Sequence, residues 1–292
     1  MIVLWGLPSD PPLRAAAAQL ARLGADYVLV GPDARLARPW SPRAEACLAL
    51  PGRELLLNDV TAAYLRPQLD NPGGAQERDL MQTMLAWADC TSALVLNRPQ
   101  AMAPNNSKPL QARWIGRFGL RVPESIVTTD PDCVRSFVAR HGDVIYKSIS
   151  GVRSVVRRLD ALRMRELDAI AGCPTLFQRY IPGDDIRVHI IGAQVHALAI
   201  RSDRDDYRYA ATDGGHVEAE VVQLEPSIAQ QLASMAHRMG LLLAGIDLRR
   251  EPGGELYCLE VNPSPGFTYF ERLAGVDLAS SVAALLLRHQ DP

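Results

Sequence analysis

Lysine is almost absent from this chain of 292 residues. Only Lys108 and Lys147 are lysines among its 31 basic residues, and all the others are arginines. An excess of charge of one sign is also lacking, because 33 acidic residues leave a formal net charge of −2. Proteins that bind nucleic acid non-specifically neutralise many phosphates with basic side chains. The charge balance therefore predicts no nucleic-acid partner.

Three further absences narrow the class of protein. The five cysteines form no CxxC pair, which argues against a disulfide framework and against a zinc site. No stretch approaches the roughly 20 apolar residues of a membrane-spanning helix, and the start MIVLWGLPSD lacks the basic segment of a signal peptide. No GxGxxG loop follows the first predicted strand, so a dinucleotide site is not indicated. We expect a cytoplasmic protein without a membrane partner.

The composition that is present is typical of a globular protein. Hydrophobic residues make up 48% and charged residues 22% of the chain, and the length is enough for about two domains. In the N-terminal third, predicted strands and helices alternate, which favours an α/β domain with a mostly parallel sheet. The predicted strands are 2–6, 27–31, 54–58, 61–65 and 93–97, and the predicted helices are 13–23 and 78–89.

A stretch rich in proline and asparagine, NRPQAMAPNNSKP (97–109), predicts a domain boundary. Beyond it we expect further helices and strands, and a mobile polar loop from Arg201 to His216. The predicted helices are 110–118, one beginning at Pro131, one beginning at Pro226, and 276–288. The predicted strands are 124–129, 144–147, 175–181, 185–191, 194–200, 243–249 and 255–261.

The most informative segment is GIDLRREPGGELYCLEVNPSPG (245–266), which reads as a β-hairpin. A two-residue turn at Gly253-Gly254 would pair Pro252 with Glu255. In that register Asp247 lies directly opposite Glu260, and Asn262 shares their face because side chains alternate along a strand. The apolar residues of the hairpin would pack on the opposite face, and these are Ile246, Leu248, Leu259 and Val261.

Two opposed carboxylates repel each other unless a cation lies between them. Asp247, Glu260 and Asn262 offer oxygen ligands only, the set that suits Mg²⁺, and Mn²⁺ is also compatible with it. The competing interpretation is a solvated sheet face, on which alternating acids are common. The register and the added Asn262 favour the metal site.

The two lysines occupy positions suited to binding phosphate. Lys147 ends an apolar strand and precedes Ser148-Ile149-Ser150-Gly151, a small-residue turn whose N–H groups can cover an anion. Lys108 lies at a helix start, where an anion is also favoured. Taken alone, a lysine that reaches from a strand end into solvent is an equal interpretation of Lys147.

Two histidines, His189 and His196, are predicted to face each other across a turn at Gly192-Ala193. Two histidines without a third converging ligand make a poor zinc site. We therefore expect them to be surface residues or to be satisfied by ordinary hydrogen bonds.

Taken together, these segments resemble the ATP-grasp ligases. The motifs are the strand ending in Lys147, LFQRYIPGDDIRVHIIG (176–192) and GIDL…CLEVNPSPG, and the resemblance covers roughly residues 97–290. Within that superfamily the chain is similar to the ribosomal-protein glutamate ligases. It is more similar still to the ligases that crosslink microviridin-type (graspetide) precursor peptides, through AAYLRP (62–67), NNSKPLQ (105–111), YKSISG (146–151) and SDRDDYR (202–208).

The resemblance implies a fold and a set of site residues. It implies an ATP-grasp fold with an N-terminal α/β domain (1–98), a central ATP-binding subdomain (99–182) and a C-terminal subdomain (183–292) that carries the metal ligands. ATP would lie between two sheets, with its adenine against the backbone of the linking strand. The implied nucleotide-binding residues are Lys108, Lys147, Ser150, Gly151, Gln178, Arg179, Tyr180, Ile181 and Asp185, and the implied metal ligands are Asp247, Glu260 and Asn262.

The resemblance also implies a reaction. A substrate carboxylate, which we expect to belong to a peptide or protein, would attack the γ-phosphate of ATP, and an amine or hydroxyl would then displace phosphate from the acylphosphate. Arg187 would face the nucleotide or the acylphosphate, and Arg201 and Arg208 would grip the substrate carboxylate. The chain departs from many members in having one glycine, Gly151, in the loop after Lys147, where a basic run follows.

Two alternatives remain beside this assignment. The enzyme could ligate a free amino acid or another small molecule, as glutathione-synthetase-like members do. A protein of another class would bind ATP and regulate without turnover, although the presence of the metal triad and of both lysines argues against it. The acceptor, the type of bond formed and the oligomeric state are left open, and a homodimer is compatible with the sequence.

Overall fold

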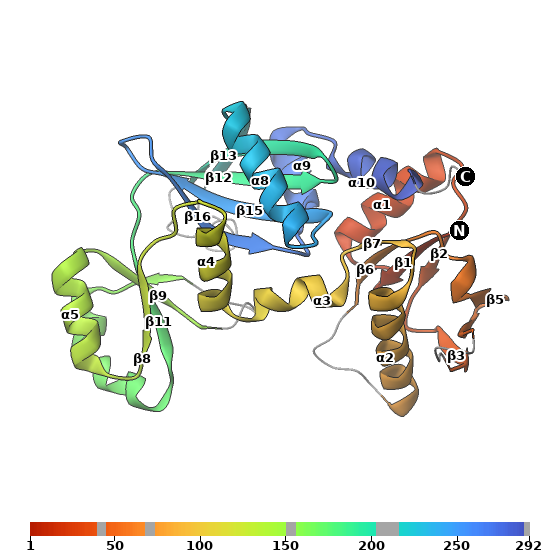
Figure 1. The fold of residues 1–292 in the computed structure, drawn as a ribbon, viewed down its shortest axis with the longest axis horizontal. Coiled ribbons are helices and arrows are strands. Elements are labelled where there is room, and N and C mark those ends of the chain that lie inside the picture. The colour runs from red at the N-terminus through yellow and green to blue at the C-terminus, as the bar shows by residue number, and fades with distance from the viewer. Residues whose placement is uncertain (40–44, 68–73, 150–155, 203–215, 289–292) are drawn as a thin grey trace.

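The computed structural model of the chain describes residues 1–39, 45–67, 74–149, 156–202 and 216–288. Figure 1 places the N-terminal domain on the right, a small central sheet on the lower left and a larger C-terminal sheet above and between them. The two sheets on the left are the parts that shape the candidate site.

The N-terminal domain is built on a parallel sheet, as the alternation of strands and helices predicts. Its strands are β1 (Ile2–Gly6), β2 (Tyr27–Val30), β6 (Ala62–Arg66) and β7 (Leu94–Leu96), in the order β2-β1-β6-β7. Helix α1 (Pro11–Arg22) begins at Pro11 because Asp10 caps it by accepting from the Leu13 N–H. Helix α2 (Ala75–Cys90) contributes Leu80, Met84 and Trp87 to the core.

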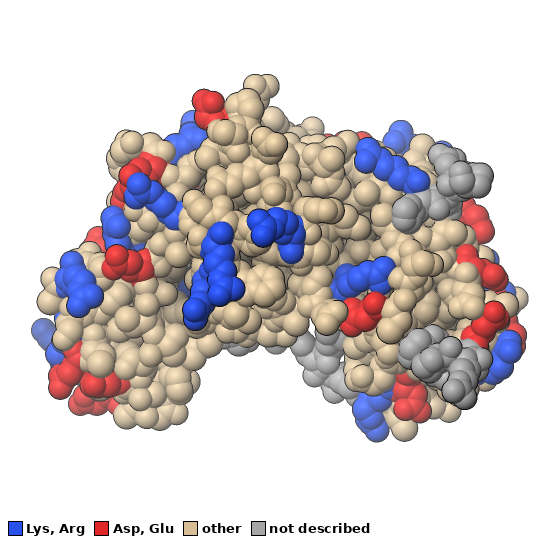
Figure 2. All heavy atoms as spheres, in the orientation of Figure 1, with Lys and Arg blue, Asp and Glu red and all other residues tan. Residues whose placement is uncertain are grey.

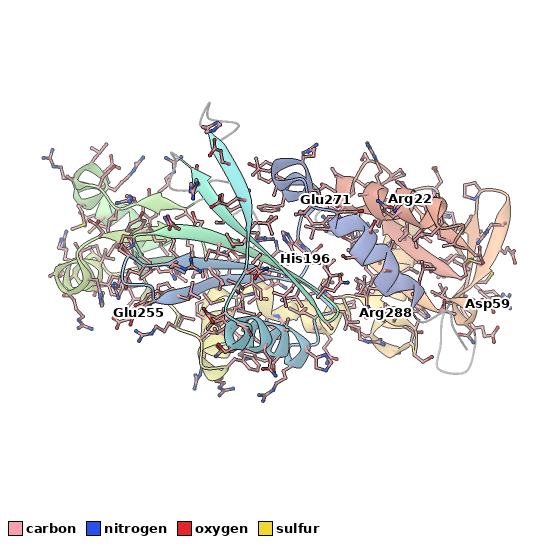
Figure 3. The ribbon with its side chains drawn as sticks, turned by 90° about the horizontal axis from the view of Figure 1, so that it is seen from above. Arg22, Asp59, His196, Glu255, Glu271 and Arg288 are labelled. Carbon is pink, nitrogen blue, oxygen red and sulfur yellow. The ribbon has the colours of Figure 1, made fainter. Side chains whose placement is uncertain are left out.

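The C-terminal helix α10 (Leu278–Leu287) belongs by its packing to this N-terminal core. Its apolar side chains share one cluster with Leu4 of β1 and Leu13 of α1. Seen from above, α10, which ends just before Arg288, lies beside α1 (Figure 3), and Arg22 of α1 donates to Ser280 of α10. The end of the chain therefore joins the N-terminal domain to the C-terminal sheet.

One part of the N-terminal domain differs from the prediction. The segment expected as a strand at 54–58 belongs to a separate antiparallel sheet, formed by β3 (Arg35–Arg38), β4 (Cys47–Leu50) and β5 (Arg53–Leu56). The short 3-10 turn η1 (Leu57–Asp59) then leads into β6. Strands β3 and β4 lack a long alternating pattern, and for that reason they were not predicted.

The predicted boundary at 97–109 is helical. Helix α3 (Pro99–Met102) and the 3-10 turn η2 (Ala103–Asn106) lead into α4 (Lys108–Arg117). Ser107 caps α4 by accepting from the Leu110 N–H, so Lys108 is the first residue of the helix. The proline-rich sequence thus places Lys108 at a helix N-terminus, as expected.

The central sheet has the order β10-β9-β11-β8 and is antiparallel. Its strands are β8 (Ser125–Thr128), β9 (Val144–Lys147), β10 (Arg157–Arg158) and β11 (Thr175–Arg179). Helix α5 (Pro131–His141), capped by Asp130, packs on one face through Val134 and Phe137. Helix α6 (Ala161–Arg165) and the 3-10 turn η3 (Leu167–Gly172) complete that face, so the other face is left to the site.

The C-terminal sheet has the order β14-β13-β12-β15-β16. Its strands are β12 (Asp184–Ile191), β13 (Gln194–Ser202), β14 (Val217–Val222), β15 (Leu243–Arg250) and β16 (Leu256–Asn262). Helix α8 (Pro226–Arg238) and α4 cover one face through residues such as Leu232, Met235 and Ile115. Helix α9 (Thr268–Ala274), which was not predicted, contacts β14 and places Phe270 on the other face.

The surface view adds the outer form of the molecule. Basic and acidic side chains are interspersed over the face in Figure 2, and the molecule is hollowed between the central lobe and the N-terminal lobe. Among the helices of the described residues, none is long and apolar enough to cross a membrane. The expected loop at 201–216 falls largely outside the described residues, although Arg201 and Ser202 belong to β13.

Candidate active site

An open cavity of about 720 Å³ lies between the central and C-terminal sheets. Its wall contains residues of β9, of the linking segment after β11, and of the β15–β16 hairpin. From the predicted site it includes Lys147, Gln178, Arg179, Tyr180, Ile181, Asp185, Asp247 and Glu260. The structure therefore brings together most of the residues that the sequence assigned to a nucleotide.

Strand pairing explains how the central sheet contributes to the cavity. Lys147 lies opposite Leu176, and Ile145 lies opposite Gln178, so these side chains share one face. The intervening Tyr146 packs on the other face with Phe177. Lys147 is 8% exposed and Gln178 is 6% exposed, so the cavity presents two buried polar side chains.

Helix α4 brings the second lysine to the same end of the sheet. The Lys108 backbone N–H donates to the Ile149 carbonyl at 3.2 Å, two residues beyond Lys147. Lys108 is also buried, with 9% of its surface exposed. The contact between the two segments explains why lysines so far apart in sequence lie in one region.

The hairpin places Asp247 directly opposite Glu260, as predicted, but by a different route. The predicted two-residue turn is wrong: the Glu251 N–H donates to the Glu255 carbonyl, which leaves Pro252, Gly253 and Gly254 as a three-residue loop. Pairing runs in that register to Leu248 opposite Cys258, and a register shift follows. The shift compensates for the longer turn, so the Asp247–Glu260 pair is still formed.

The register shift is a β-bulge at Leu259, and it changes the face on which Leu259 lies. The prediction placed Leu259 in the hydrophobic core, whereas the structure places it in the cavity wall beside Glu260. Cys258 takes the core position instead, together with Ile246, Leu248 and Val261. Complete burial raises the pKa of the Cys258 thiol, which keeps it protonated. Bulges commonly re-aim one side chain in this way.

A second cavity, of about 620 Å³, lies on the other side of the carboxylate pair. It is lined by Arg187, Asp247, Glu260, Asn262, Gly266, Tyr269 and Phe270. Asp247 and Glu260 therefore belong to both cavities. A ligand in the first cavity and a ligand in the second would meet at these two carboxylates.

Arg187 is held rigidly against this pair. Its Nη1 donates to Asp247 Oδ1 at 2.8 Å, and the two side chains are only 5% and 17% exposed. The guanidinium carbon lies 5.2 Å from the centre of the Phe270 ring. Gly245 leaves room for the guanidinium, because a Cβ at that position would collide with it. A buried charge paired in this way is fixed in position and has little rotational freedom.

The predicted pairing of His189 with His196 is confirmed, but the expected environment of His189 is wrong. His189 is fully buried, its Nδ1 has no hydrogen-bond partner, and its Nε2 lies 3.5 Å from Arg187 Nε. Burial, then the positive charge of Arg187, then His196 hold the pKa of His189 well below its ordinary range. His189 is therefore neutral and can accept from the arginine.

The donors at the carboxylate pair fit a hard divalent cation. Asp247 and Glu260 are direct cross-strand neighbours, and Asn262 lies on the same strand face, opposite Gly245. Within the described residues, no three His, Cys, Asp or Glu side chains gather as a metal cluster. Two carboxylates and one amide form a sparse oxygen set, and Mg²⁺ is suited to such a set because it keeps waters and phosphates as its other ligands.

The segment that links the two sheets is braced by ion pairs. Arg179 Nη2 lies 2.9 Å from Glu251 Oε1, and Arg249 Nη1 lies 3.3 Å from Asp185 Oδ1. Two guanidinium groups lie over the Tyr180 ring, that of Arg158 at 3.8 Å and that of Arg249 at 5.3 Å from the ring centre. Strand β11 ends at Arg179, so Tyr180 and Ile181 follow the strand and do not belong to it, contrary to the prediction.

Four other predicted residues have different outcomes. Arg201 lies on the opposite face of the C-terminal sheet from Arg187, and it pairs with Glu220 at 2.8 Å in an exposed position. The structure therefore does not bring Arg201 to the site, because strand alternation turns it away. Arg208, Ser150 and Gly151 lie outside the described residues.

Several lining residues were missed by the sequence analysis. They are Pro123, Ile145, Val156, Arg249 and Leu259 in the first cavity, and Tyr269 and Phe270 in the second. Ile145 and Arg249 could have been found, since each lies two residues from a predicted site residue on the same strand face. Tyr269 and Phe270 belong to a short helix after a proline-rich turn, for which the sequence offered no signal.

Known proteins share the sequence family and the fold of this chain. A family described as the RimK-like ATP-grasp domain matches residues 107–286. A probable alpha-L-glutamate ligase of Enterobacter sp. (strain 638) is 30% identical over 209 residues, which cover 68% of each chain. A glutathione synthetase of Thermosynechococcus vestitus is 29% identical over 216 residues, which cover 69% of this chain and 65% of the relative.

A solved structure matches along almost the whole chain. The ATP-grasp ligase PsnB, complexed with a phosphomimetic variant of its minimal precursor, Mg and ADP, is 27% identical and has a TM-score of 0.83. The match covers 99% of this chain and 98% of PsnB, so it includes the N-terminal domain, which lies outside the family match. The predicted ATP-grasp fold is confirmed, and this chain belongs to the RimK-like ATP-grasp family of ligases.

Proposed function

We propose that this protein is an ATP- and Mg²⁺-dependent ligase that activates a carboxylate of a peptide or protein as an acylphosphate. The observation that carries the proposal is the position of Asp247 and Glu260, which line both cavities. A nucleotide in the first cavity would present its phosphates to this pair, and a carboxylate in the second would approach from the other side. Such an arrangement suits phosphoryl transfer, in which positioning and charge neutralisation do most of the work.

In the first step, a carboxylate oxygen attacks the γ-phosphorus, and the bond from that phosphorus to the ADP oxygen breaks. In the second, an amine or hydroxyl attacks the acyl carbon, loses its proton and expels phosphate with the electron pair. Asp247, Glu260 and Asn262 would hold Mg²⁺, which supplies charge neutralisation at the phosphates when bound. Lys147 and Lys108 bind phosphate oxygens from the central sheet side, and Arg187 orients the acceptor carboxylate or the acylphosphate.

Arg187 and Tyr269 provide the polar groups of the second cavity outside the metal ligands. Phe270 covers the Arg187 guanidinium, so a carboxylate bound there is partly shielded from water. Shielding protects an acylphosphate from hydrolysis. The same cavity leaves Asp247 and Glu260 to the metal, because a substrate carboxylate is attracted to the arginine and repelled by the acids.

A peptide substrate is supported by the extent of the likeness to PsnB, which spans both chains almost completely. The likeness to glutathione synthetase covers about two thirds of this chain and favours the second candidate, ligation of a free amino acid or small molecule. The full-length likeness favours the peptide, since it includes the N-terminal domain. Because the cytoplasm supplies ATP, we place the reaction there, and a homodimer is compatible with the proposal.

The metal site is tested by replacing Glu260 with glutamine. We expect Glu260→Gln to lower phosphate release by about 10²-fold or more, because one of two anionic ligands is lost. Without metal, the Tm of this variant should equal that of the unaltered protein or be slightly higher, since two directly opposed carboxylates repel each other. Full activity in this variant would contradict the metal assignment.

The substrate is tested by a phosphate-release screen with ATP and Mg²⁺. Peptides rich in Asp, Glu, Ser, Thr and Lys are compared with free amino acids and γ-glutamyl dipeptides. Mass spectrometry of the products detects the loss of one water molecule for each bond formed. Release that requires a peptide supports the proposal. Release with a free amino acid and with no peptide favours the small-molecule ligase. Binding of ATP without release under any condition favours a non-catalytic protein.

A further inference from the structure

The segment that carries the metal ligand Asn262 is held by side chains from outside the C-terminal sheet. Strand β16 ends at Asn262, and the chain then forms a turn with Pro263, Ser264 and Pro265. Asn262 Oδ1 accepts from the Ser264 N–H at 2.9 Å, so the side chain of the ligand is oriented by this turn. The position of the turn therefore controls the position of the ligand.

Gln111 of α4 holds the residue before the ligand. Its Nε2 donates to the Val261 carbonyl at 2.7 Å, and its Oε1 accepts from the Val261 N–H at 3.0 Å. Strand β16 is at the edge of its sheet, so the amide takes the place of a neighbouring strand. Gln111 is 3% exposed, and such a buried pair of hydrogen bonds fixes the strand end.

Asn97 holds the residue after the ligand. Its Nδ2 donates to the carbonyls of Pro263 and Leu243, both at 2.6 Å, and its Oδ1 accepts from the N–H groups of Leu242 and Leu243. Asn97 is 1% exposed. A single amide thus fastens the ligand turn to the start of β15.

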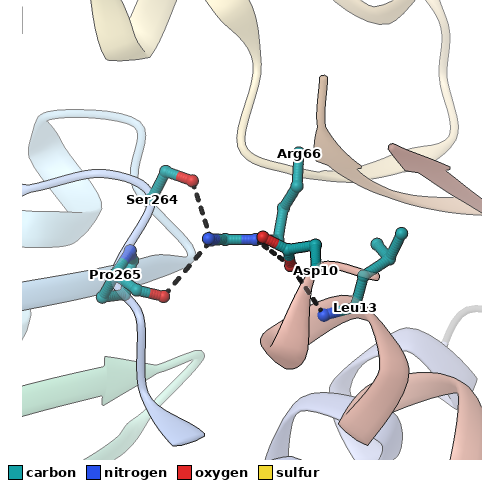
Figure 4. Close-up of polar contacts among 5 residues, drawn as sticks. All are labelled: Asp10, Leu13, Arg66, Ser264 and Pro265. Carbon is teal, nitrogen blue, oxygen red and sulfur yellow. Dashed lines mark hydrogen bonds and ion pairs between the residues drawn. The ribbon is translucent and has the colours of Figure 1, made fainter. Parts of the chain in front are cut away.

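Arg66 holds the turn itself from the N-terminal domain. Its Nη1 donates to Ser264 Oγ at 2.9 Å and to the Pro265 carbonyl at 3.3 Å, while its Nε pairs with Asp10 at 2.7 Å (Figure 4). Asp10 in turn caps helix α1 through the Leu13 N–H. Arg66 lies in the AAYLRP segment and Gln111 in the NNSKPLQ segment, and the proposed reaction gives neither of them a chemical role.

We infer that Arg66, Asn97 and Gln111 are positioning residues for the metal site, and that they set the affinity of the protein for its metal–nucleotide complex by fixing Asn262. The inference rests on the proposed function, because it presupposes a divalent cation at Asp247, Glu260 and Asn262. Groups that orient metal ligands typically change metal affinity by about 10- to 100-fold when they are lost.

The variants are chosen to leave the local charge unchanged. Arg66→Lys keeps a cation beside Asp10 but loses the fork that reaches two acceptors, and Gln111→Met keeps the volume without the amide. Matched controls exist outside the site. Arg98 donates to the carbonyls of Ala88, Thr91 and Ala93, all within the N-terminal domain, and Gln231 donates to the Phe118 carbonyl.

The test measures Mn²⁺ binding by electron paramagnetic resonance in the full-length protein, with a non-hydrolysable ATP analogue present. We expect about tenfold weaker Mn²⁺ binding in Arg66→Lys and Gln111→Met than in Arg98→Lys and Gln231→Met. Raising the Mg²⁺ concentration should restore most of the ADP release in the first two. A melt recorded without metal is compared across all four.

Equal Mn²⁺ affinity in the test and control variants, with lowered melts in the test variants, would show a structural role only and overturn the inference. Should Gln111→Met fail to fold, Arg66→Lys and Ser264→Ala carry the same comparison from the two ends of one hydrogen bond. If the unaltered protein binds no Mn²⁺ with the nucleotide, the proposed metal site itself is wrong. If it binds Mn²⁺ and the variants match their controls, only the positioning role is wrong.

Discussion

Buried charge is the feature that distinguishes the site at the scale of single residues. Lys147, Lys108 and Arg187 are all less than 10% exposed, although charged side chains are seldom buried. Arg187 is paired with Asp247. Lys147 lines the first cavity, and the Lys108 N–H donates to the Ile149 carbonyl two residues beyond it. All the other basic residues of the chain are arginines, so its only two lysines lie in this one region.

We predict that Lys147→Arg lowers kcat/KM for ATP by about tenfold or more. The guanidinium is bulkier than the ammonium and must fit an enclosed position opposite Leu176, where overpacking costs about 1–3 kcal/mol. The measurement is the rate of ADP release at varied ATP concentration. Arg163→Lys, in an exposed ion pair with Glu166, is the control for exchanging the two cations. An equally active Lys147→Arg enzyme would leave the scarcity of lysine without functional meaning.

The limits of sequence analysis are clear from individual residues. Asp247, Glu260 and Asn262 could be placed together because a hairpin relates them locally. Arg66, Asn97 and Gln111 could not, since they contact the ligand turn across the domain boundary and follow no periodic pattern. His189 was taken for an ordinary histidine because strand alternation does not reveal which face of a sheet α9 covers.

For the β15–β16 hairpin, the predicted Asp247–Glu260 pair is confirmed, but the predicted turn and register are wrong. A three-residue turn and a bulge at Leu259 together give the same Asp247–Glu260 pair as a flat hairpin with a two-residue turn. The sequence contains both Gly253 and Gly254, which favour the shorter turn. A bulge leaves little trace in a sequence, and its consequence is that Leu259 lies in the cavity wall.

We predict that deleting Leu259 removes the bulge, and that it weakens the binding of ATP while the binding of the metal is kept. Without Leu259, pairing passes from Leu248–Cys258 directly to Asp247–Glu260, so the ligand pair and the core contacts are kept. The first cavity loses an apolar side chain worth about 1.5–3 kcal/mol when buried. We expect the KM for ATP to rise about tenfold or more.

The measurement compares the deletion with Leu259→Ala, which keeps the bulge and loses only the side chain. Similar KM values in the two variants, with Mn²⁺ binding retained in both, would agree with this account. Loss of Mn²⁺ binding in the deletion alone would show that the bulge also sets the ligand pair.

At the scale of the whole molecule, the three segments share cores and hydrogen bonds that their order in the sequence does not indicate. The predicted boundaries 1–98, 99–182 and 183–292 follow the sequence, yet α10 from the last segment completes the core of the first. Arg66 and Asn97 extend from the first segment to the turn after β16. Local sequence patterns predict where one domain ends and the next begins. They do not predict which hydrophobic core α10 joins.

Gly183 connects the two sheets that enclose the first cavity. It follows β11 and precedes β12, has a φ of +128°, and a Cβ there would collide with the Arg250 carbonyl on β15. Gly142 also has a positive φ, of +71°, but nothing lies near the position of its Cβ. A side chain at either glycine would therefore strain the backbone, but only at Gly183 would it also collide with a neighbouring strand.

We predict that Gly183→Ala and Gly142→Ala both lose about 1–3 kcal/mol of stability through their backbone conformation, and that only Gly183→Ala weakens nucleotide binding. With Mg²⁺ and an ATP analogue at about 100 times Kd, binding stabilises the unaltered protein by about 2.7 kcal/mol, or roughly 5–10 °C in Tm. Gly142→Ala should keep this shift, because the added methyl group meets no other atom and displaces no part of the cavity wall. In Gly183→Ala the shift should fall to half or less, since the added methyl separates the linking segment from β15 and widens the cavity. Equal shifts in the two variants would mean that the sheets close on the nucleotide without help from this contact.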